Sequence, residues 1–269
     1  MGRRNADGAW PDTDLGWARA RRWWVRGRRV GSVERAATFL DDVGFALLFP
    51  APNLLAPSLW EAVAGEDVEP FGTGMGDKEQ KVWTWKDELP RRGLAWYGAY
   101  LAGRGSFLSP ALLAALYPGE GEPDDHEELD LSPTAHRLAR KLAVAPASSA
   151  ALRTLIGDRN RYQRAVGELQ RNLLVTTAGV QEARSGWPAA VLTLTCEQFD
   201  VGGRQDRAEA AMQYLDTTLE AAPAELARAF RWPATLAREQ LDRLVEAGRA
   251  TTDGARYRPC PAVPIKRRR

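Results

Sequence analysis

Apolar residues recur at helical spacing through most of the chain from residue 32 onward. The stretch SVERAATFLDDVG (32–44) places them on one helical face, between a serine N-cap and a glycine stop. FALLFP (45–50) predicts a short buried strand that its proline closes. SLWEAVAG (58–65) and SPALLAALYPG (109–119) predict short capped helices, whereas GLAWYGAYLAGRG (93–105) fits either a strand or a helix. This half of the chain therefore combines helices with short strands.

The pattern is clearer after residue 131. Three helices are predicted by LSPTAHRLARKLAVA (131–145), SSAALRTLIG (148–157) and DRNRYQRAVGELQRNLLV (158–175). Ser132 before Pro133 is the N-cap and first-turn proline arrangement with which many helices begin. Two β-rich segments follow within 176–199, around a Gly/Ser turn. Three helices followed by a β-hairpin form the order of a winged helix.

The same order recurs towards the end of the chain. DRAEAAMQYLDTTLEAA (206–222), APAELARAFRW (222–232) and PATLAREQLDRLVEAG (233–248) predict three helices. RATTDGARYRP (249–259) predicts a hairpin, because Asp-Gly is a strong signal for a tight β-turn. Two copies of one unit favour a tandem arrangement.

Composition limits the kind of protein. A chain of 269 residues with 44% hydrophobic and 27% charged residues is typical of a globular protein with a sizeable core. Apolar runs are too short to span a bilayer, so we expect no membrane association. The two cysteines and two histidines lack metal-ligand spacing, so we expect no metal and no cofactor. We expect a cytoplasmic protein.

Charge is unevenly distributed, although the net charge is only +2. Residues 1–31 hold many arginines among tryptophans, the chain ends in IKRRR, and GEGEPDDHEELD (119–130) is acidic. The basic ends could contact phosphates or could be solvated tails. The acidic Pro/Gly segment is the best candidate for a linker.

These patterns predict a mainly α-helical α+β fold of tandem winged helices, each with a small β-wing. We expect a flexible basic extension over 1–31 and an N-terminal winged-helix-like domain over 32–131, which includes the acidic linker. A middle winged helix over 132–201, a C-terminal winged helix over 202–259 and a basic tail over 260–269 complete the predicted organisation.

The helix predicted over 159–173 is the candidate recognition helix, because the third helix of such a unit lies in the major groove of DNA. Tyr162, Val166, Leu169 and Leu173 form its expected buried stripe. The predicted DNA contacts are Arg159, Asn160, Arg161, Gln163, Arg164 and Arg171. Arginine suits guanine edges and phosphates, whereas asparagine and glutamine suit adenine. The alternative is a solvated helix face that serves only for packing.

The third helix of the last unit carries acids that would repel phosphates, at positions 239, 242 and 246. We therefore expect this unit to be a scaffold or a protein contact. Arginines of its wing are its candidate DNA contacts, and Arg256 is the residue we select.

The segment KVWTWKDELP (81–90) combines aromatic, basic and acidic residues. If it is extended, Trp83 and Trp85 share one face and could stack on bases, or could pack in the core. Lys86 is a further candidate DNA contact. Asp87 and Glu88 could act as catalytic acids near a nucleobase, or could be turn and cap residues before Pro90.

The chain resembles the AlkZ-related branch of the YcaQ/AlkZ winged-helix proteins over about residues 32 to 259. The segments WKDELP and GLAWYG carry the most specific part of the resemblance, together with VGFALLFP, SLWEAV and the tandem units. The resemblance implies three tandem winged helices around a DNA channel. It also implies metal-free, monofunctional glycosylase activity on bulky alkylated purines and interstrand crosslinks.

That family positions the hydrolytic water with a Gln-x-Gln or Gln-x-Asp motif after a Gly-Phe pair. Here Leu47 and Phe49 occupy those two positions, so the catalytic residues do not carry over, and Asp87 and Glu88 are the candidate replacements. We therefore expect a protein that binds double-stranded DNA, alkylated or crosslinked, in repair or damage recognition. The alternatives are an active glycosylase that uses other acids, and a winged-helix regulator or protein-interaction module.

Overall fold

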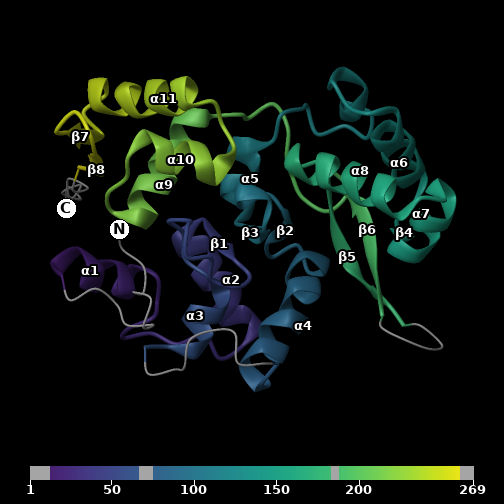
Figure 1. Cartoon of the computed structure of the whole chain (residues 1–269), viewed down its shortest axis with the longest axis horizontal. Helices are drawn as coiled ribbons and strands as arrows, with labels where there is room; N and C mark the ends of the chain where they lie inside the picture. Colours follow the sequence, from purple (N-terminus) through teal and green to yellow (C-terminus); the bar gives the residue numbers. More distant parts are fainter. Residues whose placement is uncertain (1–12, 67–74, 183–187, 261–269) are drawn as a thin grey trace, which may run out of the picture.

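The computed structural model describes residues 13–66, 75–182 and 188–260. Figure 1 shows helices and small antiparallel sheets arranged around a shared interior, with the first part of the chain below, the middle part at the right and the last part at the upper left. This α+β fold confirms the predicted fold class. Within the described ranges, no helix is long and apolar enough to cross a membrane.

The first folded unit begins with a helix and ends with a hairpin. Its elements are α2 (Val33–Val43), β1 (Phe45–Leu47), α3 (Leu59–Ala64), α4 (Asp77–Arg91), β2 (Trp96–Ala99), the 3₁₀ helix η1 (Leu101–Gly103) and β3 (Gly105–Leu108). The strands pair antiparallel in the order β1-β3-β2. Ser32 and Ser58 cap α2 and α3 with their hydroxyl groups, as the sequence predicts for both. Segment 93–105 thus contains β2, η1 and the first residue of β3.

The middle unit repeats this order. Helix α5 (Pro110–Leu116) and the short 3₁₀ helix η2 (Asp125–Glu128) lead into it. Its elements are α6 (Pro133–Val144), β4 (Ala147–Ser148), α7 (Ser149–Ile156), α8 (Arg159–Arg171), β5 (Val175–Gln181) and β6 (Ala189–Leu194). The strand order β4-β6-β5 matches that of the first sheet. Ser132 caps α6, and Gly157 ends α7 with a left-handed backbone, as predicted.

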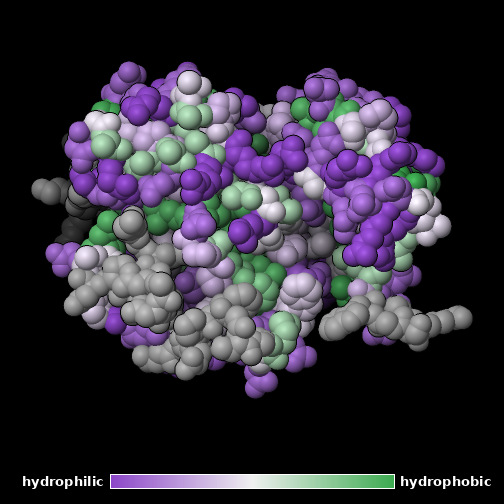
Figure 2. Space-filling view, viewed as in Figure 1, coloured by the Kyte–Doolittle hydropathy of each residue, from purple (hydrophilic) through white to green (hydrophobic). Residues whose placement is uncertain are grey.

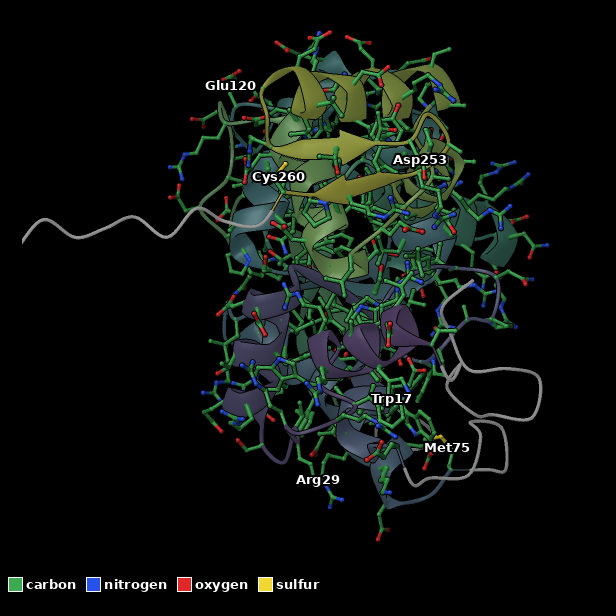
Figure 3. All side chains as sticks on the ribbon, turned by 90° about the vertical axis from the view of Figure 1, so that its left-hand side faces the viewer. Trp17, Arg29, Met75, Glu120, Asp253 and Cys260 are labelled. Carbon is green, nitrogen blue, oxygen red and sulfur yellow. The ribbon has the colours of Figure 1, made fainter. Side chains whose placement is uncertain are left out.

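The last unit has the same plan. It contains α9 (Arg207–Thr218), α10 (Pro223–Phe230), α11 (Ala234–Glu246), β7 (Ala250–Thr252) and β8 (Tyr257–Pro259). Ala221 forms an antiparallel bridge to Tyr257, in the place that β1 and β4 occupy in the earlier units. Figure 3 shows Asp253 at the predicted turn of the β7–β8 hairpin. One order of helices and strands therefore occurs three times.

Residues 13–31 are not the solvated extension that the sequence suggests. They form α1 (Asp14–Arg22) and pack on the end of α9. Arg19 is fully buried and donates to the carbonyls of Thr218 at 2.6 Å and Glu220 at 2.8 Å. The indole of Trp23 donates to the Thr217 carbonyl at 2.7 Å. The C-terminal carbonyls of a helix lack partners within that helix, and Arg19 and Trp23 donate to those of Thr218 and Thr217 here. The rest of the basic extension, 1–12, and the tail 261–269 lie outside the described residues.

The acidic segment 119–130 is an ordered loop between α5 and α6. The Asp125 carboxylate accepts hydrogen bonds from the Tyr117 hydroxyl and from the backbone amides of residues 120, 121 and 122, at 2.8 to 3.0 Å. Gly121 and Gly202 let the backbone of this loop lie close to the backbone at residues 201 and 202, just after the middle unit. A Cβ on Gly202 would lie 2.0 Å from the carbonyl oxygen of Glu120. The acidic residues therefore build local structure.

The segment KVWTWKDELP lies in α4, so the extended conformation that would place its two indoles on one face is not present. Val82, Trp85 and Leu89 are buried at helical spacing and face the core of the first unit. Pro90 is tolerated in the last turn because the carbonyl that it leaves without a helical partner, that of Lys86, accepts from the Thr177 hydroxyl of β5 at 3.5 Å. The proline thus contributes to a contact between the first and middle units.

Candidate nucleic-acid interface

Helix α8 has the buried face that the sequence predicts. Asp158 caps it by accepting from the Arg161 amide at 2.7 Å. Tyr162 and Leu169 are buried, and Val166 is partly buried against the same core. Leu173, beyond the helix end, is also buried. The opposite face of α8 is therefore free to meet solvent or a ligand.

That opposite face is strongly basic. The six predicted contacts on α8 are all exposed: Arg159, Asn160, Arg161, Gln163, Arg164 and Arg171. The one acid of this stripe, Glu168, accepts from the amide of Ser132 at 2.8 Å and from its hydroxyl at 2.6 Å. Its carboxylate is therefore held at the N-terminus of α6 by Ser132 and is not paired with any of these arginines. Figure 2 shows hydrophilic side chains gathered over the region of α8.

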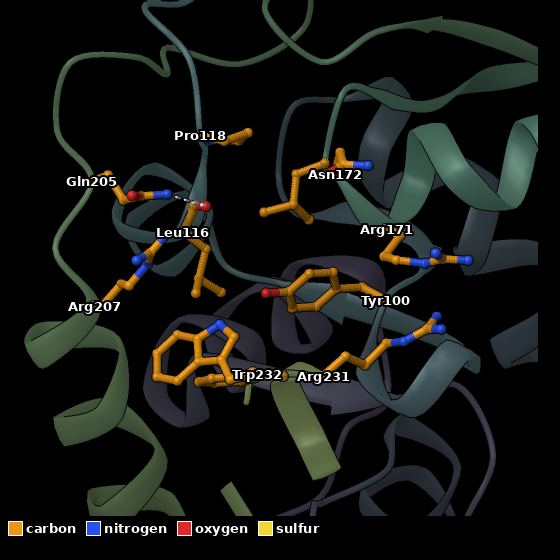
Figure 4. Close-up of a pocket in the computed structure, with 11 residues that line it drawn as sticks. Tyr100, Leu116, Pro118, Arg171, Asn172, Gln205, Arg207, Arg231 and Trp232 are labelled. Atoms are coloured by element: carbon orange, nitrogen blue, oxygen red, sulfur yellow. Dashed lines mark hydrogen bonds between the residues drawn. The ribbon is translucent and has the colours of Figure 1, made fainter. Parts of the chain in front are cut away.

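A pocket of about 220 Å³ lies where the three units meet, and Figure 4 shows it. It is lined by Tyr100, Leu116, Pro118, Arg171, Asn172, Leu173, Gln205, Arg207, Phe230, Arg231 and Trp232. No carboxylate is among these lining residues. Its volume is below the range of about 300 to 1,000 Å³ that is usual for sites that hold a whole small molecule. It therefore suits one group of a larger ligand.

Three arginines reach this pocket from three different elements. Arg171 ends α8, Arg207 begins α9, and Arg231 follows α10 in a left-handed backbone conformation with φ of 57°. In the part of the chain that the structure describes, none of the three forms an ion pair with a carboxylate. Figure 4 shows Arg171 and Arg231 on one side and Arg207 on the other, beside Gln205. The pocket is consequently suited to bind an anion.

The pKa shifts of Arg231 and Tyr100 reflect the positive charges that lie close to them in the pocket. Partial burial lowers the pKa of Arg231, and repulsion from Arg171 lowers it further. Burial also raises the pKa of Tyr100, while the positive charges of Arg207 and Arg231 oppose that rise. Tyr100 is therefore a neutral hydrogen-bonding group at physiological pH. An anion between the arginines would relieve their mutual repulsion.

Sequence reasoning found Arg171 but missed the other pocket residues. Tyr100, Arg207 and Arg231 lie far from it in the chain, and no local motif connects them. Arg231 has a positive φ, which is uncommon for a residue other than glycine. This backbone conformation marks the residue as unusual, but the sequence does not reveal it.

Asp87 and Glu88 lie in the second half of α4, so neither is a turn or cap residue. The Lys86 ammonium pairs with Asp87 Oδ2 at 2.6 Å. Asp87 Oδ1 is buried and has no hydrogen-bond partner. Glu88 pairs with Arg92 at 3.3 Å. Neither acid lines the arginine pocket, so the structure does not bring these candidates together with the basic site.

The two tryptophans of α4 point in different directions. Trp85 is 7% exposed and packs in the core of the first unit, whereas Trp83 is 43% exposed. The Lys86 ammonium lies 4.6 Å from the centre of the Trp83 ring. Of the two indoles, only Trp83 is exposed enough for a surface contact, and Lys86, whose side chain is 12% exposed, lies beside it. A helix does not place these two indoles on the shared face that an extended segment would give them.

Arg256 is already engaged within the last unit. Its guanidinium pairs with Glu220 and, at 3.0 Å, with Glu225. A contact with phosphate would have to break these ion pairs, so the structure offers it less support than it offers the arginines of α8.

Comparisons with known proteins agree with this architecture. The chain resembles the solved structure of Streptomyces sahachiroi DNA glycosylase AlkZ with a TM-score of 0.53 and 15% identity, over 90% of this chain and 67% of that one. At this identity the likeness concerns the fold. No match was found among curated protein sequences. The model of the family described as AlkZ related matches residues 30–231, which is most of the chain. This protein therefore belongs to the AlkZ-related family.

Proposed function

We propose that the three repeated units are winged helices and that the protein binds double-stranded DNA along α8 and the arginine pocket. The shared order of helices and strands supports the first part. The second part is supported by the position of α8 as third helix of the middle unit, with its arginines exposed.

One observation carries this proposal. Arg171 belongs both to the exposed stripe of α8 and to the acid-free pocket. The two basic features therefore form one continuous surface, which suits a polyanion better than an isolated anion. Arginines that follow a helix into a concave pocket match the electrostatic footprint of a nucleic-acid-binding protein.

The biological role that we propose is DNA repair, in the recognition of alkylated or crosslinked DNA. Membership of the AlkZ-related family supports this role, as does the fold shared with a protein named DNA glycosylase AlkZ. Leu47 is fully buried in β1, and Phe49 packs against the core of the first unit. These two side chains contribute to packing and offer no group that could orient a water molecule. We therefore propose damage recognition rather than base excision as the primary activity.

Binding of a fluorescent DNA duplex, measured by anisotropy over a series of salt concentrations, tests the proposal. The affinity is expected to fall steeply with added salt, because phosphate contacts release counterions. Arg161→Gln and Arg164→Gln should each weaken binding. Arg243→Gln on α11 is the matched control, since Arg243 pairs with Glu239 at 2.6 Å on an exposed helix face. Binding that ignores salt, or a control that weakens as much as the α8 variants, would indicate a protein-interaction module instead.

The second candidate function is base excision, and the unpartnered Asp87 Oδ1 is the observation that favours it. The test is release of 7-alkylguanine from an alkylated duplex by the wild type, Asp87→Asn and Glu88→Gln. If the wild type releases the base and either substitution abolishes this release, the protein is a glycosylase whose catalytic acid lies on α4. The absence of release, with duplex binding intact, is the result that we expect for a recognition protein.

A further inference from the structure

A second cluster of polar side chains lies away from the basic surface, where the acidic loop meets α6. His126 and Glu127 come from η2, and His136 comes from the second turn of α6. One ligand atom from each of these residues lies within 4.8 Å of those of the other two. His126 Nε2 is 3.2 Å from Glu127 Oε1, and His136 Nδ1 is 3.9 Å from Glu127 Oε2. Two imidazoles and one carboxylate thus converge on one point.

One ring nitrogen of each histidine in this cluster lacks a hydrogen-bond partner. The His126 side chain is only 4% exposed, yet its Nε2 makes no hydrogen bond, and neither does His136 Nδ1. A buried polar atom without a partner is costly, so such atoms usually serve a ligand or a bound water. Both nitrogens lie next to the Glu127 carboxylate. A cation between them could accept lone pairs from all three residues.

The hydrogen bond of His126 is made by Nδ1, which leaves Nε2 available to a metal ion. Its Nδ1 lies 3.1 Å from the carbonyl oxygen of Pro123, which can only accept, so Nδ1 carries the proton. In the neutral ring, Nε2 then presents its lone pair to the cluster. A ring nitrogen that donates to a backbone carbonyl while the other binds the ion is the usual support of a metal-ligating histidine.

The loop that carries two of these residues is built before any ion arrives. The four hydrogen bonds accepted by Asp125 fix the backbone immediately before His126. A hollow of about 490 Å³, lined by Glu122, Pro123, Asp124, His126, Glu127, Arg140 and Ala143, opens beside the cluster. An ion can therefore enter from solvent and meet ligands that are already oriented.

We propose that His126, Glu127 and His136 form a binding site for a divalent transition-metal ion, and that zinc is the ion it suits best. Two histidines and one glutamate are a ligand set that zinc accepts with a water in the fourth position. Imidazole nitrogens favour zinc over calcium and magnesium, which prefer oxygen ligands. The bound ion clamps the acidic loop to α6 and so stiffens the junction between the first and middle units.

Arg140 competes for the same carboxylate. It donates to Glu127 Oε1 at 2.8 Å and to Oε2 at 3.0 Å, from a side chain that is 62% exposed. The guanidinium is a positive charge at the edge of the site, so it both shares the ligand and repels an incoming cation. Removal of Arg140 should therefore strengthen metal binding, an effect opposite to that of removing a ligand.

The test is isothermal titration of the untagged full chain with ZnCl₂, in a buffer that does not chelate zinc. We expect one zinc per chain, no heat with CaCl₂ or MgCl₂, and a rise in melting temperature with zinc. His136→Ala, on an α6 surface that tolerates alanine, should lower the affinity at least about ten-fold, because loss of even a supporting residue has that effect. Arg140→Gln should raise it. Glu128→Gln, an exposed neighbour, is the matched control.

Two results would overturn the proposal: no zinc bound by the wild type, or His136→Ala that binds zinc as tightly as Glu128→Gln. This inference is independent of the proposed function. His136→Ala should bind DNA like the wild type, so either conclusion can fail without the other.

Discussion

The arginine pocket makes a quantitative prediction about DNA binding. Glutamine in place of Arg171, Arg207 or Arg231 keeps a polar, though shorter, side chain and removes the charge. If each arginine neutralises one phosphate, the slope of log K against log salt becomes shallower by about 0.9 per substitution. The three together account for a slope of about 2.7, so a rise from about 50 to about 200 mM salt costs about 40-fold in affinity through the pocket alone.

The assay is fluorescence anisotropy of a labelled duplex at several salt concentrations, with each variant first shown to keep its circular dichroism spectrum and melting temperature. Over that salt range, the factor by which affinity falls should be about 3.5 times smaller for each single variant than for the wild type. Arg204→Gln is the control, because Arg204 lies close to Arg207 in the chain but pairs with Asp200 at 2.9 Å outside the pocket. Its slope should equal that of the wild type.

A triple variant whose salt dependence is unchanged would refute the reasoning, because the pocket would then contact no phosphate. Weaker binding at every salt concentration with an unchanged slope would have the same meaning. That result would indicate that the arginines support the fold of the site rather than meet the anion.

Three further predictions concern stability and reactivity. Gly202→Ala should lower the free energy of unfolding in urea by about 3 to 6 kcal/mol, because the energies of backbone strain and of a clash with the backbone of Glu120 add together. Gly248→Ala is the control, because its backbone is strained but has open space around it, so it should cost only about 1 to 2 kcal/mol. Arg19→Met should cost about 3 kcal/mol or more in the same assay, because two charge-assisted hydrogen bonds to carbonyls are lost. Burial raises the pKa of Cys196 to about 11, so in a Cys260→Ser background this thiol should react with iodoacetamide at pH 8 about 200-fold more slowly than an unperturbed thiol.

The sequence predicted the elements whose signals are local. Serine caps at positions 32, 58 and 132 and the Asp-Gly turn at 253 and 254 are all present where they were expected. Each is fixed by hydrogen bonds or turn geometry over three or four residues, so the neighbouring sequence suffices. The buried stripe of α8 was predicted for the same reason.

The period of the apolar residues, and not the residue types, identifies α4 as a helix. The run VWTW favours a strand by residue type, but Val82, Trp85 and Leu89 are buried at spacings of three and four, which only a helix brings to one face. The proline at position 90 suggested an end to regular structure. It is accommodated because a side chain from β5 bonds the carbonyl it releases.

The pocket and the histidine cluster could not be predicted, because their members come together only through tertiary structure. Tyr100, Arg171 and Arg231 are separated by many residues and belong to different units. His126 and His136 lack the spacing of a known metal motif, and the buried state of His126 depends on the packing of the acidic loop. The extension over 13–31 was misinterpreted for a related reason, since its partner carbonyls lie about two hundred residues away.

The junction between the first two units explains how the pocket can be rigid although its walls come from separate units. Strand β2 lies at the edge of its sheet, and an edge strand has backbone groups that need partners. Side chains of the middle unit provide them: Thr176 bonds the Tyr97 amide at 3.2 Å, and Gln170 accepts from the Ala99 amide at 3.0 Å. Ala99 precedes Tyr100, and Gln170 precedes Arg171. The residues on two walls of the pocket are therefore held by bonds between their immediate neighbours, so an arriving phosphate meets groups whose positions are set and little ordering entropy is lost on binding.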